Sequence, residues 1–250
     1  MTSTILFEQE AGIATLRFNR PDRRNALGRE ELSGIQLALG ALKPETRVLV
    51  ITSASGSTFC AGADLQQIRA GELDGDQFQQ VTNELADLSI PTLCVINGNV
   101  FGGGCELAMS CDFRLASQDI KMRVPASAIG LCYPIEGIDR FVSRLGVSVA
   151  KRILVAAEEF SAEQMLEFGI VSRLISSDSL IKESNLTAKM LAQRAPLAVA
   201  AMLKVIRQAE RGRINYQEAR DLAAICSDSD DLKEGLLAQK ERRPAVFKGC

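Results

Sequence analysis

The alternation of strand and helix patterns over the first half of this 250-residue chain is the strongest constraint on its fold. Short apolar runs rich in β-branched residues, Val48–Ile51 and Thr92–Ile96, predict buried strands. Between and around them, apolar residues recur at helical spacing over Arg29–Leu42 and Gln77–Leu88. Strands that alternate with helices in this way are typical of a layered α/β fold.

The second half of the chain is mostly helical from about Ile135 onward. A last strand is predicted over Val171–Ile175, and Ala195-Pro196 is the best candidate for a boundary. We therefore expect two regions, residues 1–195 and residues 196–250. The helices predicted after the last strand are Ser177–Gln193, Leu197–Arg211, Tyr216–Cys226 and Asp231–Glu241.

The chain contains no histidine, and this excludes several classes of active site. Neither a Ser-His-Asp triad nor a Cys-His pair can form, and no histidine can bind zinc or haem iron. The seven cysteines contain no CxxC spacing, so we expect no metal site and reduced thiols. A general acid or base that works near neutral pH must then be a carboxylate, Lys, Tyr or Cys.

Charge and hydropathy point to a soluble protein. The formal net charge is −2, from 29 basic and 31 acidic residues, so no basic surface predicts binding to nucleic acid or membrane. The most apolar stretch, residues 93–111, is interrupted by Asn97, Asn99 and Glu106. The first residues carry acids and no basic cluster, so we expect no signal peptide and a cytoplasmic location.

Two glycine-bearing segments each follow a predicted strand and precede a helix: Cys60–Asp64 and Gly102–Glu106. Backbone N–H groups at a helix start lack partners, and glycine lets a ligand approach the main chain closely. Two such N–H groups, one from each loop, could stabilise a developing oxyanion, with help from the helix dipole. The alternative is that the glycines only permit tight turns. The spacing completes neither GxGxxG nor a phosphate-binding P-loop.

Glu106 is the strongest single candidate for chemistry. Small and apolar residues surround it in the sequence, so its carboxylate would be partly desolvated and its pKa raised toward useful acid–base values. Equally, it could be an ordinary first-turn glutamate that stabilises the helix dipole.

An ordered set of motifs resembles the enoyl-CoA hydratase/isomerase (crotonase) superfamily nearly from end to end. The set comprises Asn19-Arg20-Pro21 with Asn25-Ala26-Leu27, Phe59–Asp64, Asn97-Gly98 with Gly102–Glu106, Cys111-Asp112, Ala162–Val171, Glu234-Gly235 and Lys240–Phe247.

This resemblance implies an α/β crotonase (ClpP-like) spiral of ββα units with a helical C-terminal trimerisation region. It also implies a homotrimer or a dimer of trimers, with no metal or other cofactor besides coenzyme A as part of the substrate. By position, the N–H groups of Ala63 and Gly103 would form the oxyanion hole, and Glu106 would act as acid and base. The implied contacts with coenzyme A are Arg24, Ala26, Ala61, Asp64, Leu65 and Arg242, the last reaching a neighbouring subunit. Arg24 could equally be a solvated surface charge.

The chain departs from the family pattern at Ala126, where hydratases usually carry a second catalytic glutamate. Glu106 could run hydration alone, could shuttle a proton in Δ3-Δ2 isomerisation, or could serve a malonyl-type decarboxylase. Tyr133 stands where some decarboxylases of the superfamily have a tyrosine, although it could simply be a core residue. Glu136 and Asp139 could replace the missing acid if their segment turned inward, but surface exposure is their default.

We therefore expect an enzyme that stabilises the enolate of an acyl-CoA thioester, with reversible hydration of a 2-enoyl-CoA as the leading activity. The alternatives within the superfamily are isomerisation and decarboxylation. A hypothesis of another class is a non-catalytic acyl-CoA binding protein, which the loss of an acid at Ala126 motivates. The acyl group is expected to be chosen by the 65–90 and 130–145 regions.

Overall fold

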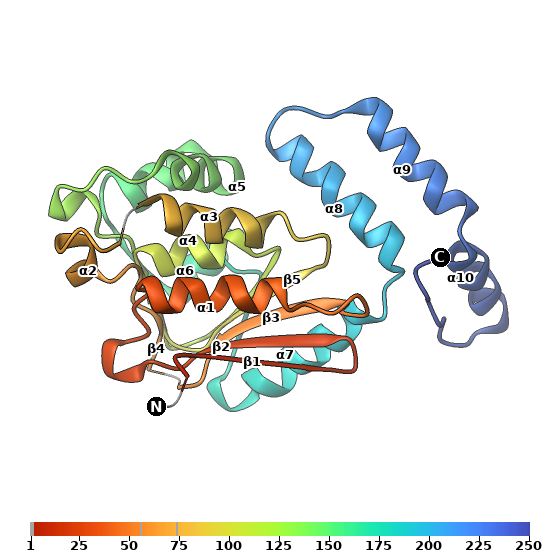
Figure 1. Ribbon diagram of the computed structural model, residues 1–250, viewed down its shortest axis with the longest axis horizontal. Helices are drawn as coiled ribbons and strands as arrows, with labels where there is room; N and C mark the ends of the chain where they lie inside the picture. The colour runs from red at the N-terminus through yellow and green to blue at the C-terminus, as the bar shows by residue number, and fades with distance from the viewer. Residues whose placement is uncertain (1–2, 56, 74) are drawn as a thin grey trace.

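The computed structural model describes residues 3–55, 57–73 and 75–250. Its larger sheet has the strand order β1-β2-β3-β5-β7-β10 (Figure 1). β1 and β2 form an antiparallel hairpin, and the remaining pairs are parallel. The strands are β1 (Ile5–Glu10), β2 (Ile13–Phe18), β3 (Val48–Ser53), β5 (Thr92–Ile96), β7 (Phe113–Ser117) and β10 (Arg173–Ile175).

Helices cover both faces of this sheet, which explains why its central strands are almost continuously apolar. Successive side chains of a strand point to opposite faces. Along β3, Val48 and Val50 therefore pack with α7, whereas Leu49 and Ile51 belong to the main core. The two predicted buried strands are confirmed at these positions.

A smaller sheet has the order β4-β6-β8-β9. β4, β6 and β8 run parallel, and β9 is antiparallel to β8. β4 (Thr58–Cys60) and β6 (Asn99–Phe101) have only three residues each, as do β8 (Lys121–Arg123) and β9 (Glu159–Ser161). Strands this short give little periodic signal, and the sequence pattern did not predict β4 or β6. The two glycine-bearing segments follow β4 and β6 directly, not the strands of the larger sheet.

Seven α-helices of the described core pack around the sheets. Gly146 interrupts α5 with φ 76° and ψ 161°, which bends this long helix. The helices are α1 (Arg29–Gly40), α2 (Leu65–Arg69), α3 (Gly75–Ala86), α4 (Gly103–Ser110), α5 (Ile135–Leu154), α6 (Ala162–Glu167) and α7 (Ser177–Ala192), and 3-10 turns occupy Pro21–Arg23 and Ser127–Ile129.

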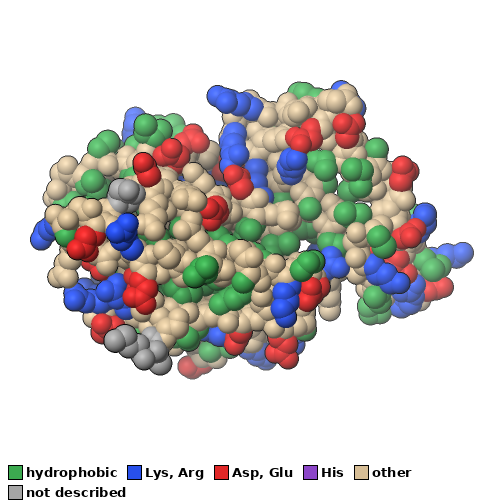
Figure 2. Space-filling view, viewed as in Figure 1, with side chains coloured by type: hydrophobic (Ala, Val, Ile, Leu, Met, Phe, Trp, Pro, Cys, Tyr) green, Lys and Arg blue, Asp and Glu red, His purple; other side chains and the backbone are tan. Residues whose placement is uncertain are grey.

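The last three helices form a separate arm that projects from the core (Figure 1). They are α8 (Pro196–Glu210), α9 (Tyr216–Asp228) and α10 (Asp230–Glu241). No residue of α8 or α9 is buried. Figure 2 shows hydrophobic side chains on the surface of the arm. The large apolar side chains exposed along the arm are Met202, Ile206, Tyr216, Ile225, Leu232, Leu236, Leu237 and Val246.

Charged contacts join this arm to the core. Arg207 on α8 donates to the Leu88 carbonyl and pairs with Asp112 at 3.4 Å. Glu210 pairs with Arg144 of α5 at 2.8 Å, and Arg211 pairs with an aspartate after α3. The arm is therefore docked through ionic contacts and not through a shared apolar core.

Within the described residues, none of the helices has the length and apolar character needed to cross a membrane.

Candidate active site

Two loops place two main-chain amides next to each other. The loops follow β4 and β6, which pair in parallel, so both leave the same edge of the smaller sheet. The N–H groups of Ala63 and Gly103 donate to no acceptor among the described residues. A Cβ atom built on Gly103 would lie 3.4 Å from the Ala63 nitrogen. The loops therefore bring the two predicted amides together and leave both unpaired.

The first loop is fixed by hydrogen bonds to residues 24–27. The Ala61 N–H donates to the Arg24 carbonyl at 3.0 Å, and the Leu27 N–H donates to the Gly62 carbonyl at 2.8 Å. Gly62 has φ +87°, and a Cβ atom there would lie 2.6 Å from the Gly103 nitrogen. Only glycine fits this position, because both the backbone angle and the close approach exclude a side chain.

The second amide lies at the start of α4. Gly102 precedes the helix with φ 51° and ψ −124°, and no side chain caps the helix start. Gly103 is the first helical residue, so its N–H has no partner inside the helix and lies at the positive end of the helix dipole. A Cβ atom on Gly103 would come within 2.7 Å of the Phe78 ring. A side chain at this position would therefore require the Phe78 ring to shift.

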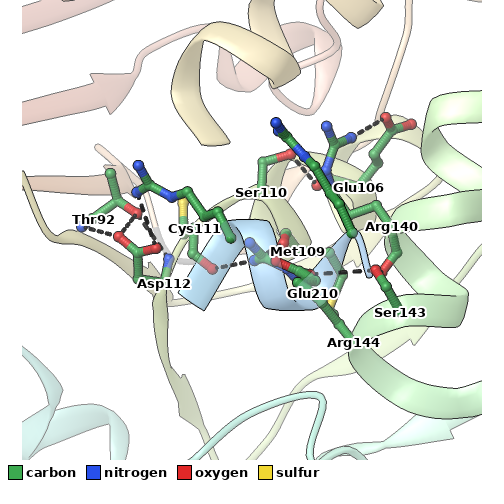
Figure 3. Close-up of polar contacts among 12 residues, drawn as sticks. Thr92, Glu106, Met109, Ser110, Cys111, Asp112, Arg140, Ser143, Arg144 and Glu210 are labelled. Carbon is green, nitrogen blue, oxygen red and sulfur yellow. Dashed lines mark hydrogen bonds and ion pairs between the residues drawn. The ribbon is translucent and has the colours of Figure 1, made fainter. Parts of the chain in front are cut away.

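The carboxylate of Glu106 is completely buried one turn into α4. Its Oε1 accepts hydrogen bonds from Arg140 Nη1 at 2.7 Å, Gln79 Nε2 at 2.9 Å and Thr82 Oγ1 at 3.3 Å. Figure 3 shows the Arg140 contact from α5. Its Oε2 has no hydrogen-bond partner among the described residues. The two oxygens of one carboxylate therefore have different surroundings.

Burial and charge act in opposite directions on this carboxyl group. Burial raises the pKa of Glu106 above its ordinary value of 4.5, and the Arg140 charge with the side-chain interactions of Gln79, Tyr133 and Thr82 partly offsets that rise. The net direction is upward, which suits a group that both takes and returns a proton. Burial also raises the pKa of the neighbouring Tyr133 hydroxyl well above 10.0.

A cavity of about 320 Å³ joins these groups. Ala63, Gly103 and Glu106 line it, and Glu106 is its one carboxylate among the described lining residues. We call it the acyl cavity, after the acyl group that the sequence resemblance leads us to expect there. Its other lining residues are mostly apolar: Ala61, Leu65, Ile68, Leu73, Gly75, Phe78, Gly102, Val124, Pro125, Ala126, Ile129, Leu131, Cys132, Tyr133 and Pro134.

The structure brings some of the other candidate residues to the acyl cavity. Ala61 and Leu65 line it, and so does Ala126. Tyr133 lines it as well and donates a long hydrogen bond of 3.5 Å to the Gly102 carbonyl. Glu136 does not reach it, because this residue is exposed on α5 and lines a second cavity.

The remaining candidates lie outside the acyl cavity. Arg24 is exposed with φ +53°, and Ala26 is half-buried in the same loop. Asp64 accepts from backbone N–H groups at the start of α2 and pairs with Arg20 at 3.4 Å. Arg242 ends α10 in the arm, and its side chain is exposed.

Sequence reasoning missed the groups that hold Glu106. Arg140 is 34 residues away along the chain, and a charged residue on a helix is exposed by default. A weak signal existed on α3, where Gln79 and Thr82 are buried beside the apolar Phe78, Val81 and Leu85. No group of three or more Cys, Asp or Glu side chains in the described part of the chain could hold a metal ion.

The chain is similar to known proteins over nearly its whole length. A family model described as enoyl-CoA hydratase/isomerase matches residues 8–250. A crotonyl-CoA hydratase of Syntrophomonas wolfei is 32% identical, with 97% of each chain covered. A short-chain-enoyl-CoA hydratase of Clostridium acetobutylicum is 28% identical, with 96% of each covered.

The solved structure of an enoyl-CoA hydratase from Bacillus anthracis superposes with a TM-score of 0.91 at 26% identity, covering 99% of this chain and 100% of that one. The predicted crotonase fold is confirmed. The chain belongs to the enoyl-CoA hydratase/isomerase family.

Proposed function

We propose that this hydratase-like enzyme catalyses the reversible hydration of a short, uncharged 2-enoyl-CoA. One observation carries the proposal: an unpaired carboxylate oxygen and two unpaired amides share one mostly apolar cavity. Buried polar groups are normally hydrogen-bonded, so a cluster of unpaired ones suggests a ligand that completes them. Hydratase-family activity agrees with the names of the relatives, and two of those names specify short acyl groups.

The thioester carbonyl would accept hydrogen bonds from the Ala63 and Gly103 N–H groups. Water then adds to Cβ while Glu106 Oε2 takes one water proton, and the alkene electrons move onto the thioester oxygen. The two amides and the helix dipole stabilise that negative charge. Collapse of the enolate returns the proton from Glu106 to Cα. A single carboxylate therefore serves first as base and then as acid.

The coenzyme A part of the substrate would lie across the mouth of the acyl cavity. We propose contacts with Ala61 and Leu65, which line the cavity. The exposed Arg24 guanidinium offers a positive charge for a phosphate, and Ala26 lies in the same loop. Asp64 would act indirectly, because its side chain caps the start of α2 beside this loop. The substrate would bring its own coenzyme A, and no metal or further cofactor takes part.

We also propose that the arm mediates assembly into a homotrimer or a dimer of trimers. The exposed apolar side chains of α8–α10 support this, because apolar surface of that kind is stabilised by burial between subunits. In such an assembly Arg242 would lie near the coenzyme A of a neighbouring subunit. Sedimentation would give the number of subunits, and a monomer at micromolar concentration would contradict the proposal.

Isomerisation of a 3-enoyl-CoA is the second candidate, and Ala126 favours it. This residue lines the acyl cavity where a second acid would be expected, so one carboxylate faces the substrate within the described residues. A single base is enough to move a proton from one carbon to another. Tyr133 also lines the cavity, which keeps a malonyl-type decarboxylase as a further alternative.

One assay separates these functions. The protein is incubated with crotonyl-CoA and, separately, with a 3-enoyl-CoA, and the conjugated thioester absorbance is followed with Glu106→Gln as control. Loss of absorbance shows hydration, and a gain from the 3-enoyl substrate shows isomerisation. Flat traces combined with thermal stabilisation by acyl-CoA would instead support a non-catalytic binding protein.

A further inference from the structure

A second cavity, of about 340 Å³, lies behind the catalytic carboxylate. Its described lining residues are mostly charged or polar and come from α3, α5 and α8, in contrast with the acyl cavity. Arg140 lines this second cavity, whereas Glu106 lines the acyl cavity. Figure 3 shows the ion pair that joins these two side chains. This pair therefore lies between the two cavities.

Arg140 is held in place by two helices. Its Nη1 donates to Glu106 Oε1, and its Nη2 donates to Asn83 Oδ1, both at 2.7 Å. The guanidinium is planar, so two fixed nitrogens define the orientation of the whole group. This geometry directs one charge at one oxygen of Glu106 and leaves Oε2 unpaired beside the substrate space.

We propose that Arg140 is a positioning residue for the reaction: it binds Oε1 so that Glu106 stays ionised in a buried site with Oε2 as its one reactive oxygen. This inference rests on the proposed function, because it assigns to Glu106 the transfer of a proton. It goes beyond that function because it says which oxygen reacts and what selects it.

The electrostatics of the site support the assignment. Burial disfavours the charged carboxylate, and the Arg140 charge is the largest influence that lowers the pKa of Glu106. The other ionisable groups that face Glu106 are Tyr133, before α5, and Cys105, on α4 itself. Arg144 and Glu210 act on Arg140 with opposite signs. No other described cation contacts Glu106.

Replacement of Arg140 by glutamine is the direct test. Without the positive charge the pKa of Glu106 rises further, so the low-pH limb of the activity profile moves to higher pH. The loss of orientation is expected to lower kcat about 100-fold. Arg140→Lys restores the positive charge but not the planar, two-nitrogen geometry of the guanidinium. The low-pH limb of the activity profile is therefore expected to return toward its original position, while kcat recovers only in part.

Arg211→Gln is the matched control, because Arg211 lines the same cavity without contacting Glu106. Its pH profile is expected to match that of the unaltered enzyme. The proposal is overturned if the low-pH limb of the activity profile does not move in Arg140→Gln, or if it moves equally in Arg211→Gln.

A second measurement separates this proposal from the proposed function. The Glu106 carboxyl carbon is titrated by ¹³C NMR in substrate-free protein and is assigned by its absence in Glu106→Gln. Arg140→Gln is expected to titrate at higher pH than the unaltered chain even if no acyl-CoA is turned over. If Arg140→Gln still turns over substrate and its Glu106 titration is not shifted, the proposed role of Arg140 is contradicted while the proposed function stands.

Asn83→Ala keeps the test decisive if Arg140→Gln does not fold. This change keeps the positive charge and removes the acceptor that orients Nη2. A smaller shift in the same direction with a several-fold lower kcat is expected. An unchanged titration and an unchanged kcat in this variant would count against the positioning role.

Discussion

The two cavities that meet at the Glu106–Arg140 pair have similar volumes, about 320 and 340 Å³, but opposite linings. In the second cavity the charges neutralise one another, as in the 2.8 Å pair of Arg144 with Glu210. In the acyl cavity, Glu106 Oε2 and two amides have no described partner. The comparison teaches that a search for the site of chemistry should follow the unpaired polar groups and not the most highly charged region.

Glu106→Gln is the substitution expected to have the largest effect on activity, because it removes the one carboxylate that lines the acyl cavity among the described residues. An amide cannot accept and return a proton, so kcat for the preferred enoyl-CoA should fall about 10²–10⁴-fold. Acyl-CoA affinity, measured by calorimetry, should change little, because the oxyanion donors are intact. Proton exchange at Cα that continues at the original rate would remove Glu106 from the mechanism.

Gly103→Ala tests the amide side of the acyl cavity. The new Cβ atom would lie 2.7 Å from the Phe78 ring, so either the ring or the start of α4, with the Gly103 amide, must shift. Displacing one oxyanion donor should cost about 2.7–4 kcal/mol in kcat/KM. Gly40→Ala is the matched control, because no atom lies within 4 Å of its added Cβ. Equal kinetics in the two variants would argue against the amide pair.

A substrate with a charged acyl group tests the apolar lining of the acyl cavity. No Lys or Arg is found among the described residues around the acyl cavity. An enoyl-CoA with a terminal carboxylate would therefore bury an unpaired charge, and kcat/KM should fall by about 10²-fold relative to crotonyl-CoA. Comparable kcat/KM values for the two substrates would show that the acyl tail lies elsewhere.

The pH dependence should show a smaller but distinctive effect. The pKa of Glu106 lies above 4.5, mainly because of burial, and the enzyme needs the ionised form. Activity should therefore fall about tenfold per pH unit below that pKa. No histidine is present to add a second limb near neutral pH. A bell-shaped profile centred near pH 6.5 would contradict a single working carboxylate.

The same pKa shift has a consequence for stability. The folded state binds the Glu106 proton more tightly than the unfolded state does, so this group stabilises the fold below pH 4.5. That contribution is lost as the pH rises through the higher folded pKa. Glu106→Gln should flatten this part of the stability curve, which denaturant titration at several pH values would show.

The sequence was most informative where function depends on the main chain. Gly62 and Gly103 lie in the two glycine-bearing segments that the sequence singled out, and glycine allows the close main-chain approach found there. Ala126 was also identified by position, and it lines the acyl cavity. The short strands β4 and β6 were missed because three residues carry too little periodicity.

The partners of Glu106 could not have been predicted from local pattern. Gln79 and Arg140 lie 27 and 34 residues from it, on different helices, and only tertiary packing brings them to one oxygen. Polar residues on a helix face solvent by default, so their burial is a property of the assembled fold.

The docking of the arm has a consequence for how the enzyme responds to its medium. Arg207, Glu210 and Arg211 tie α8 to the core by charge, and the Arg211 pair is half exposed. Added electrolyte shortens the reach of such attractions to about 8 Å at physiological ionic strength, while apolar packing is little affected. Ionic strength would therefore weaken the exposed Arg211 pair first, whereas the mostly buried Arg144–Glu210 and Arg207–Asp112 pairs would be screened much less and would keep α8 in place.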